Sequence, residues 1–351
     1  MLYLGAYVYS TEQLKHYAYP NKDTFVIKLF TLFKSPPQIN LPPILNSPKI
    51  IAVVITYHPA WEELELLLKA VLPQVDSIIV IDNGSDEKSL KQITKYAKDY
   101  PIKLQCLEQN YGVATAQNQG ITLAKAQGAQ YVVLFDQDSI PAPDMVAKLL
   151  AASMSKEAAG IKVASVGPFY EYPRRQVPSR PFVNLQGLRV VLRNNDGKEK
   201  IIPVSYLIAS GSLTSIATLD VVGPMQDELF IDYVDIDWGL RARQLGYQCY
   251  GVGDAVLEHH LGDQIHFIMG KSFCFHSPLR HYYQFRNSIW HYRQPYSSLG
   301  EKIGGSWRLL KRFIACALFA KPHSENWAMM LKGVAHGMTG RLGKYGEKQK
   351  S

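Results

Sequence analysis

Two acidic residues directly follow an apolar run in the middle of the sequence. The run covers residues 131–135, and Asp136 and Asp138 come after it, one residue apart. A continuous apolar run is typical of a buried strand in a parallel sheet, and ligands bind beyond the carboxyl ends of such strands. Two carboxylates on a tight turn suit a Mg²⁺ or Mn²⁺ ion that also holds a diphosphate. The alternative is a plain turn that caps the helix expected after Pro141.

A second acidic group lies further along the chain. Asp232, Asp235 and Asp237 precede a series of residues with helical spacing, which stops at Gly246. A carboxylate in such a position can remove a proton from an acceptor hydroxyl. The alternative is a solvated helix start, where acidic side chains are stabilised by the helix dipole.

The elements that must position these acids alternate between strand and helix. The expected order is strand 50–56, helix 59–72, strand 77–81, a helix to about residue 100, strand 102–107, helix 113–127 and the strand before Asp136. This alternation predicts a parallel sheet built from right-handed crossover units, which is the usual platform for nucleotides. Thr56 and Asp82 would then end neighbouring strands at the same edge as Asp136.

The composition is that of a globular protein and excludes several classes. The chain has 351 residues, 47% of them hydrophobic and 19% charged, and its four cysteines are scattered. Such cysteines fit reduced thiols in a cytoplasmic protein and argue against a disulfide framework or a zinc site. No apolar run approaches the ~20 residues that span a bilayer, and no secretion signal is recognisable. No Gly-x-Gly-x-x-Gly follows the first expected strand, which excludes the dinucleotide fingerprint.

The first 48 residues form an N-terminal extension whose structure the sequence leaves open. Residues 24–33 fit either a strand or a short helix, and the Pro-rich residues 35–48 predict a linker. The regular alternation of strands and helices starts at Lys49. We therefore place the start of the folded domain there.

Residues 301–351 carry most of the excess positive charge. They hold ten Lys or Arg and three Glu, which gives +7 of the chain's formal +8. Apolar residues recur there at helical spacing in two stripes: Ile303, Trp307, Leu310, Ile314 and Leu318, then Trp327, Met330, Leu331, Val334 and Met338. Basic amphipathic helices with Trp on the apolar face lie in membrane interfaces, so we expect a tail that docks on the anionic inner face of the cell membrane. The alternative is that both stripes pack against the rest of the protein.

Several motifs, taken in order, make the sequence resemble a family 2 glycosyltransferase of the GT-A fold. The resemblance runs from about residue 49 to residue 293. The motifs are Ile55-Thr56-Tyr57, Ile81-Asp82-Asn83-Gly84-Ser85, the alternating positions from Asn110 to Gly120, Asp136-Gln137-Asp138, Gly211-Ser212 and residues 232–241. Residues 232–241, 259–263 and 276–287 are similar to segments of bacterial rhamnosyltransferases within the family.

The resemblance implies a fold and a domain plan. The fold would be an α/β GT-A fold, with a Rossmann-like, mostly parallel sheet flanked by helices and a C-terminal helical extension. The GT-A domain would cover residues 49–300, with a nucleotide-sugar half at 49–140 and an acceptor half at 141–300. The basic amphipathic helical tail would follow at 301–351.

The resemblance also implies roles for single residues. The nucleotide-sugar donor would contact Thr56, Asp82, Asn110, Asn118, Asp136, Arg280 and Arg286. The metal ion, Mg²⁺ or Mn²⁺, would be held by Asp136, Asp138 and His259. Much of the family carries a Glu-Asp pair where this chain has Val234-Asp235, but the rhamnosyltransferase-like members share the Asp-Tyr-Val-Asp form. Asp235 is therefore the candidate catalytic base, and Asp237 is a second candidate.

Each of these roles has a structural alternative. Asp82 fits an Asx-turn, and Asn110 and Asn118 fit a turn residue and a satisfied polar group of a helix. His259 could be a core histidine. The two arginines could brace a helix against the sheet, although their guanidinium groups also suit diphosphate oxygens.

The implied activity is inverting transfer of L-rhamnose from dTDP-L-rhamnose to a saccharide acceptor, lipid-linked or growing. The product would be a bacterial surface polysaccharide such as capsule or the O-antigen of lipopolysaccharide. The sugar could instead be galactofuranose, glucose or another deoxyhexose. A non-catalytic sugar-binding relative is a further alternative, against which the intact Asp136, Asp138 and Asp235 count. Nucleic acid is not expected as a partner, because acids at several strand ends would repel its phosphates.

Overall fold

The computed structural model describes residues 47–172, 182–187, 189–193, 199–259, 265–268 and 271–347. The expectations for residues 1–46, including the strand or helix at 24–33, lie outside these residues. The motif residues 260–263 lie outside them as well. For His259 the main chain is described and the side chain is not.

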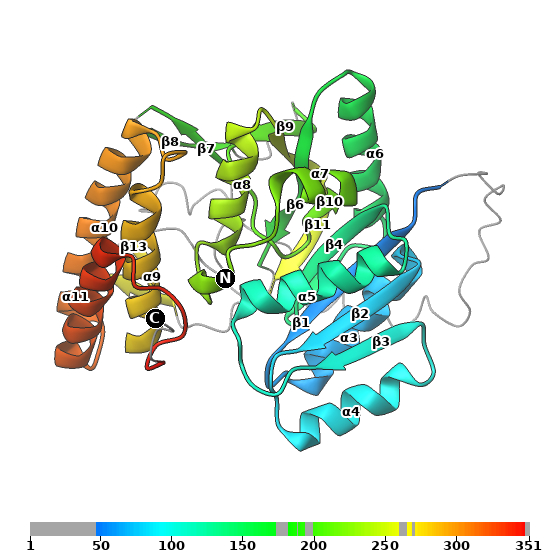
Figure 1. Cartoon of the computed structure of the whole chain (residues 1–351), viewed down its shortest axis with the longest axis horizontal. Coiled ribbons are helices and arrows are strands. Elements are labelled where there is room, and N and C mark those ends of the chain that lie inside the picture. The colour runs from blue at the N-terminus through cyan, green and yellow to red at the C-terminus, as the bar shows by residue number, and fades with distance from the viewer. Residues whose placement is uncertain are drawn as a thin grey trace.

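A nine-stranded mixed sheet forms the centre of the molecule (Figure 1). Its strands are β1 Ile50–Thr56, β2 Ser77–Asp82, β3 Ile102–Cys106, β4 Tyr131–Asp136, β5 Ser139–Pro141, β6 Val163–Glu171, β9 Ile201–Val204, β10 Leu213–Ser215 and β11 Gln248–His259. They are ordered β3-β2-β1-β4-β10-β6-β11-β5, and β9 pairs with β11. The first four strands are parallel, as the alternation predicted. β10 then runs antiparallel to both β4 and β6, so the second half of the sheet is mixed.

The remaining elements are mostly helices. They are α3 Trp61–Val71, η1 Leu72–Gln74, α4 Glu87–Ala97, α5 Val113–Ala126, α6 Met145–Ala158, α7 Ile216–Val222, η2 Asp227–Leu229, α8 Val234–Gln244, α9 Pro278–Tyr292, α10 Leu299–Phe319 and α11 His323–Thr339. Two hairpins, β7 Phe182–Gln186 with β8 Arg189–Arg193 and β12 Ile265–Ile268 with β13 Lys271–Cys274, stand apart from the main sheet. The turn after β4 does not cap a helix, because residues 139–141 form β5 and α6 begins only at Met145.

Helices cover both faces of the sheet, which explains why its parallel strands are apolar throughout. Alternate residues of β1 face opposite sides: Ile50, Ala52 and Val54 join the core under α3, α4 and α6. Ile51, Val53 and Ile55 join the core under α5, α7 and α8. A Cβ at Gly120 of α5 would lie 2.2 Å from Val53 Cγ1, so a glycine lets this helix approach the sheet closely.

Helices α9, α10 and α11 form a separate layer on the side of the molecule away from β3 (Figure 1). Phe285, Cys316 and Met330 share its small core. Helix α11 lies directly on α9, because a Cβ at Gly333 or Gly337 would be 2.5 Å from a main-chain oxygen of α9. Within the described residues, no helix is both long and apolar enough to cross a bilayer.

Candidate active site

Polar side chains end three adjacent strands of the parallel half. Thr56 ends β1, Asp82 ends β2 and Asp136 ends β4. The registers pair Thr56 with Asp82 and Ile55 with Asp136. Because the strands are parallel, these three ends lie along one edge of the sheet, where ligands of such folds bind. The structure thus brings together the strand-end residues that the sequence singled out.

Asp82 is fully buried, and its carboxylate is bonded within its own turn. It accepts hydrogen bonds from Thr56 Oγ1 at 2.8 Å, from the Ser85 main-chain N–H at 2.8 Å and from the Ser85 hydroxyl at 2.6 Å. These contacts correspond to the turn expected as the structural alternative. They also hold the carboxylate at the sheet edge, and its contact with a nucleotide base stays a prediction.

The two asparagines have different surroundings. Asn110 Oδ1 lies 3.2 Å from Nδ2 of Asn83, the residue that follows β2, so Asn110 borders the same edge. Asn118 faces the segment before α8 instead. Its Oδ1 accepts from the Met225 N–H at 2.9 Å, and its Nδ2 donates to the Met225 carbonyl at 2.8 Å and to Asp227 Oδ1 at 2.7 Å. These bonds brace α5 against that segment, so donor binding by Asn118 has no support from its position.

The turn from Asp136 to Asp138 is fixed by the side chain of Ser210 and by that of its own middle residue, Gln137. The main-chain N–H of Asp136 donates to the Ser210 hydroxyl at 3.0 Å. The Gln137 amide bonds the Tyr57 main chain twice, with Oε1 accepting at 2.7 Å and Nε2 donating at 3.2 Å. The middle residue of Asp-Gln-Asp therefore locks the turn to the end of β1.

The electrostatics of this turn fit a divalent cation. Burial, and then the nearby charge of Asp136, raise the pKa of the Asp138 carboxyl to about 7. A bound cation would reverse that effect by favouring both charged carboxylates. The register of β11 with β5 pairs His259 with Ser139, so the main chain of His259 lies beside the turn. Among the described side chains no group of three or more His, Cys, Asp or Glu has a metal-binding arrangement.

A small hollow joins the strand edge to the start of α8. Four polar residues from three parts of the chain line it together with apolar side chains: Gln117, Asp136, Asp232 and Asp235. Asp235 lies in the first turn of α8, where its carboxylate accepts from the N–H of Ile236 at 2.9 Å and of Ala209 at 3.3 Å. The acid that ends β4 and the candidate base therefore face one space.

The loop before α8 has an unusual backbone. Phe230, Asp232 and Tyr233 have φ angles of +65°, +71° and +69°, which side chains other than glycine rarely adopt. Each such residue costs on the order of 1–3 kcal/mol, and such strain gathers at functional sites. The Asn287 amide of α9 holds the loop by donating to three of its carbonyls, at 2.8 to 3.0 Å.

Two residues of the hollow received no role from the sequence. Gln117 Oε1 and Asp232 Oδ2 are buried and have no hydrogen-bond partner among the described residues. A buried polar atom without a partner costs about 1–3 kcal/mol, which a hydroxyl group of a bound sugar would offset. In the sequence, only their positions pointed to the site: Gln117 directly precedes Asn118 in its motif, and Asp232 is the first residue of the acidic group.

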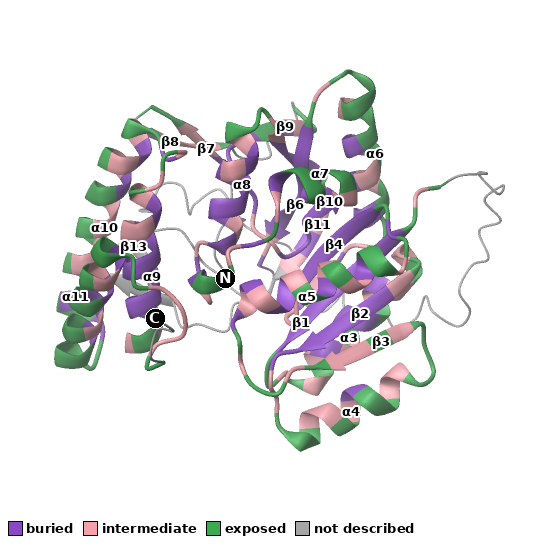
Figure 2. Ribbon diagram, in the orientation of Figure 1, coloured by how far each residue is buried: buried purple, intermediate pink, exposed green. Residues whose placement is uncertain are grey.

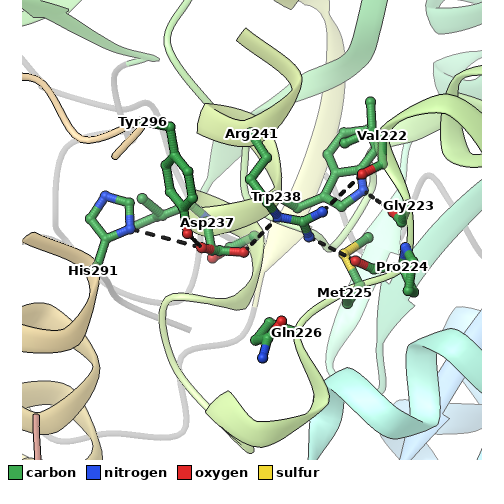
Figure 3. Close-up of polar contacts among 12 residues, drawn as sticks. Val222, Gly223, Pro224, Met225, Gln226, Asp237, Trp238, Arg241, His291 and Tyr296 are labelled. Atoms are coloured by element: carbon green, nitrogen blue, oxygen red, sulfur yellow. Dashed lines mark hydrogen bonds and ion pairs between the residues drawn. The ribbon is translucent and has the colours of Figure 1, made fainter. Parts of the chain in front are cut away.

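Asp237 points into a closed cluster (Figure 3). It is 1% exposed, and one of its oxygens accepts from Arg241 Nε at 2.9 Å. The other accepts from the Tyr296 hydroxyl, and His291 Nδ1 lies 4.0 Å away. The remaining guanidinium nitrogens of Arg241 donate to two main-chain carbonyls before α8. Of the two candidate bases, only Asp235 faces the hollow, so the geometry favours it.

The two arginines of α9 also differ. Arg286 is fully buried, and its guanidinium group donates to the carbonyls of Leu229 and Gly343, among others. It braces α9 against the loop before α8, as the structural alternative expected. Arg280 Nη2 lies 3.4 Å from Oδ1 of Asp232, a residue that lines the hollow. Donor binding stays a prediction for both.

The fold and the acids along the sheet edge define a GT-A glycosyltransferase architecture. The structure is similar to S. aureus TarS 1–349, with a TM-score of 0.53 and 17% identity over 82% of this chain and 80% of that one. It is also similar to the mannosyltransferase PcManGT from Pyrobaculum calidifontis in complex with GDP-Man and Mn²⁺, with a TM-score of 0.50 and 16% identity over 85% and 88% of the two chains. These likenesses confirm the predicted fold.

Sequence comparison gives the family. The profile of Glycosyl transferase family 2 matches residues 52–211. The chain is 34% identical over 247 residues to the dTDP-rhamnosyl transferase RfbF of Shigella flexneri, which covers 70% of this chain and 80% of the relative. The chain belongs to glycosyl transferase family 2 and is a glycosyltransferase, as the resemblance implied.

Proposed function

We propose that the protein transfers L-rhamnose from dTDP-L-rhamnose to a hydroxyl group of a saccharide acceptor and inverts the anomeric centre. The observation that carries this proposal is the single hollow lined by Asp136 at the end of β4 and by Asp235 at the start of α8. The acid that binds the sugar donor and the base that deprotonates the acceptor must face the same space if the acceptor is to displace the diphosphate there. The similarity to a dTDP-rhamnosyl transferase supports the choice of donor.

Asp235 acts as the general base in this proposal. Two main-chain N–H groups hold its carboxylate, so it is oriented before substrate arrives. It removes the proton of the acceptor hydroxyl as that oxygen attacks the anomeric carbon. The new glycosidic bond forms while the bond from the anomeric carbon to the diphosphate breaks, and dTDP leaves with the electron pair. A single direct displacement inverts the centre, and no protein carboxylate bonds the sugar.

Asp136, Asp138 and His259 would hold a Mg²⁺ or Mn²⁺ ion at the edge of the sheet. Such an ion supplies positive charge that stabilises the departing diphosphate. The raised pKa of Asp138 supports this assignment, because two carboxylates close together favour a bound cation. PcManGT, whose fold is similar, was solved with Mn²⁺. The contacts of Gln137 and Ser210 keep the turn in place for this role.

The acceptor in this proposal is a lipid-linked saccharide of a bacterial surface polysaccharide, such as an O-antigen or capsule precursor. The protein would act in the cytoplasm, at the inner face of the cell membrane, where such carriers present their sugars. The basic residues 301–351 support this location, because they favour an anionic surface.

A panel of nucleotide sugars tests the donor. Purified protein should release nucleoside diphosphate from dTDP-L-rhamnose in the presence of acceptor, and calorimetry should show tighter binding of dTDP-L-rhamnose than of UDP-hexoses. Tighter binding and faster turnover of UDP-galactofuranose, UDP-glucose or another deoxyhexose donor would replace rhamnose in the proposal. Binding without turnover for every donor would identify a non-catalytic sugar-binding relative instead.

A further inference from the structure

Helix α10 presents an apolar face to solvent. Five large side chains are 47 to 61% exposed and follow one another at spacings of three or four residues: Ile303, Trp307, Leu310, Ile314 and Leu318. This spacing places them on one side of the helix, which we call the α10 stripe. In Figure 2 exposed segments run along α10 on the outer side of the helical layer. A contiguous apolar face of this kind marks an interaction surface.

The α10 stripe is held in place and cannot turn inward. The opposite side of the helix is buried, with Cys316 and Ala317 packed against Phe285 of α9. At its start, Glu301 accepts a hydrogen bond at 2.7 Å from Arg243 of α8, the helix that carries the candidate base. The stripe therefore has a fixed orientation relative to the active site.

The second predicted stripe behaves differently. On α11, Met330 is fully buried against α9 and Val334 is half-buried, so this part packs against the protein. Trp327, Leu331 and Met338 of α11 are exposed. The α10 stripe is thus the longer series of exposed apolar side chains in the described part of the C-terminal segment, and α11 adds three more.

The charges around this surface are basic. Lys311 lies over the Trp307 ring, with Nζ 5.2 Å from the ring centroid. Of the three glutamates in residues 301–347, Glu301 is buried, Glu347 pairs with Lys344, and Glu325 is exposed in the first turn of α11. Long basic side chains beside exposed Trp and Leu are typical of helices that lie at the interface of an anionic bilayer.

We propose that the α10 stripe is the docking surface for an anionic lipid bilayer. This inference deepens the proposed function, because it supplies the surface that brings the active site to a lipid-linked acceptor. A second copy of the chain is the competing occupant, and the basic charge disfavours it because two positively charged surfaces repel each other. On the bilayer, Trp307, Leu310 and Ile314 enter the interface while Lys311 contacts the anionic headgroups.

Vesicle co-sedimentation of the full chain tests the proposal. The wild-type protein should bind vesicles that contain phosphatidylglycerol, bind pure phosphatidylcholine weakly and dissociate as salt is raised. Trp307→Ser/Leu310→Ser should weaken binding at least tenfold, and Lys311→Glu by roughly fivefold or more. The matched control is Met154→Ser/Val221→Ser, which removes two similarly exposed apolar side chains from α6 and α7 and should bind like the wild type.

The other outcomes are equally decisive. Equal binding by the Trp307→Ser/Leu310→Ser variant and the wild type would overturn the proposal. So would a lipid-free dimer in analytical ultracentrifugation that this variant abolishes, because a second copy would then cover the stripe. Transfer to a soluble, lipid-free acceptor should be unchanged in the same variant. Vesicle binding without any transfer would refute the proposed function and leave the docking surface intact.

Discussion

Acidic side chains have opposite surroundings in two regions of the molecule. One region is the carboxyl edge of the sheet, and the other is the helical side, by which we mean α8 together with α9, α10 and α11. At the edge, Asp136 and Asp138 lie close enough that burial and mutual repulsion raise the pKa of Asp138 to about 7. On the helical side, Asp237 is more deeply buried than either of them, and Arg241 and Tyr296 each donate a hydrogen bond to one of its two oxygens. The two carboxylates at the edge are therefore suited to the positive charge of a bound ligand. The carboxylate of Asp237, in contrast, already has its hydrogen-bond partners within the protein. Substitutions at the edge should change turnover, and substitutions on the helical side should change stability.

Removal of an edge carboxylate should have the largest effect. Asp138→Ala should abolish measurable turnover, because loss of the metal site removes several kcal/mol of stabilisation of the leaving diphosphate, roughly a thousandfold or more in rate. Chelation of the wild type should do the same. Mn²⁺ should raise the melting temperature of the wild type and not of Asp138→Ala, while circular dichroism shows the same fold for both. Full activity in excess chelator would contradict this prediction.

The two acids of α8 give the sharpest test of the comparison. Asp235→Asn is nearly isosteric but cannot accept the proton, so kcat should fall by ~10²–10⁴ with little change in donor affinity or stability. Asp237→Asn should instead lower the free energy of unfolding by about 3–5 kcal/mol, because Arg241 loses its buried partner. Kinetics and urea unfolding of both variants give the answer. A large loss of kcat in stably folded Asp237→Asn alone would exchange the two roles.

A smaller change on the helical side should affect stability only. Tyr296→Phe deletes the hydroxyl that donates to Asp237, and a hydrogen bond to a charged group contributes about 1.5–3 kcal/mol. Urea unfolding should show this loss, while kcat at a temperature where the variant is folded stays near the wild-type value. Tyr111→Phe at an exposed position is the control and should leave stability unchanged.

The smallest predicted effect is a pH dependence of the helical layer. Nε2 of His281 accepts a hydrogen bond from the main-chain N–H of His276. The proton of the His281 ring is therefore on Nδ1, which donates to Asn326 Oδ1 of α11 at 2.6 Å. Burial lowers the pKa of His281 to about 4, from about 6.5 in the unfolded chain. The unfolded state therefore binds the extra proton between these values, and stability is lost as the pH falls, by roughly 1 kcal/mol at pH 5.5.

Urea midpoints at pH 7.5 and 5.5 measure this dependence. His281→Gln should reduce the difference between the two midpoints, because the side chain that replaces it does not titrate. If His281→Gln leaves the difference between the two midpoints unchanged, groups other than His281 cause the pH dependence of stability.

The sequence by itself determined the parallel half of the fold. The strands at 50–56, 77–82 and 131–136 fall where the apolar runs predicted them, and the family motifs lie at their ends. These elements are readable because a strand buried on both faces needs an uninterrupted apolar run, which is a property of adjacent residues. The edge acids were predicted for the same reason, since they directly follow those runs.

The tertiary structure decided which polar residues face the site. In the sequence, Asp235 and Asp237 are the same residue type in the same acidic group, so nothing local tells their roles apart. Their roles differ because of partners far along the chain: Ala209 for Asp235, and Tyr296, 59 residues away, for Asp237. The placement of Gln117 in the hollow and of Arg286 among buried carbonyls likewise depends on segments remote in sequence. Local patterns specify which side of a helix is apolar, but the exposure of the α10 stripe and the burial of Met330 depend on which surfaces pack together when the chain folds.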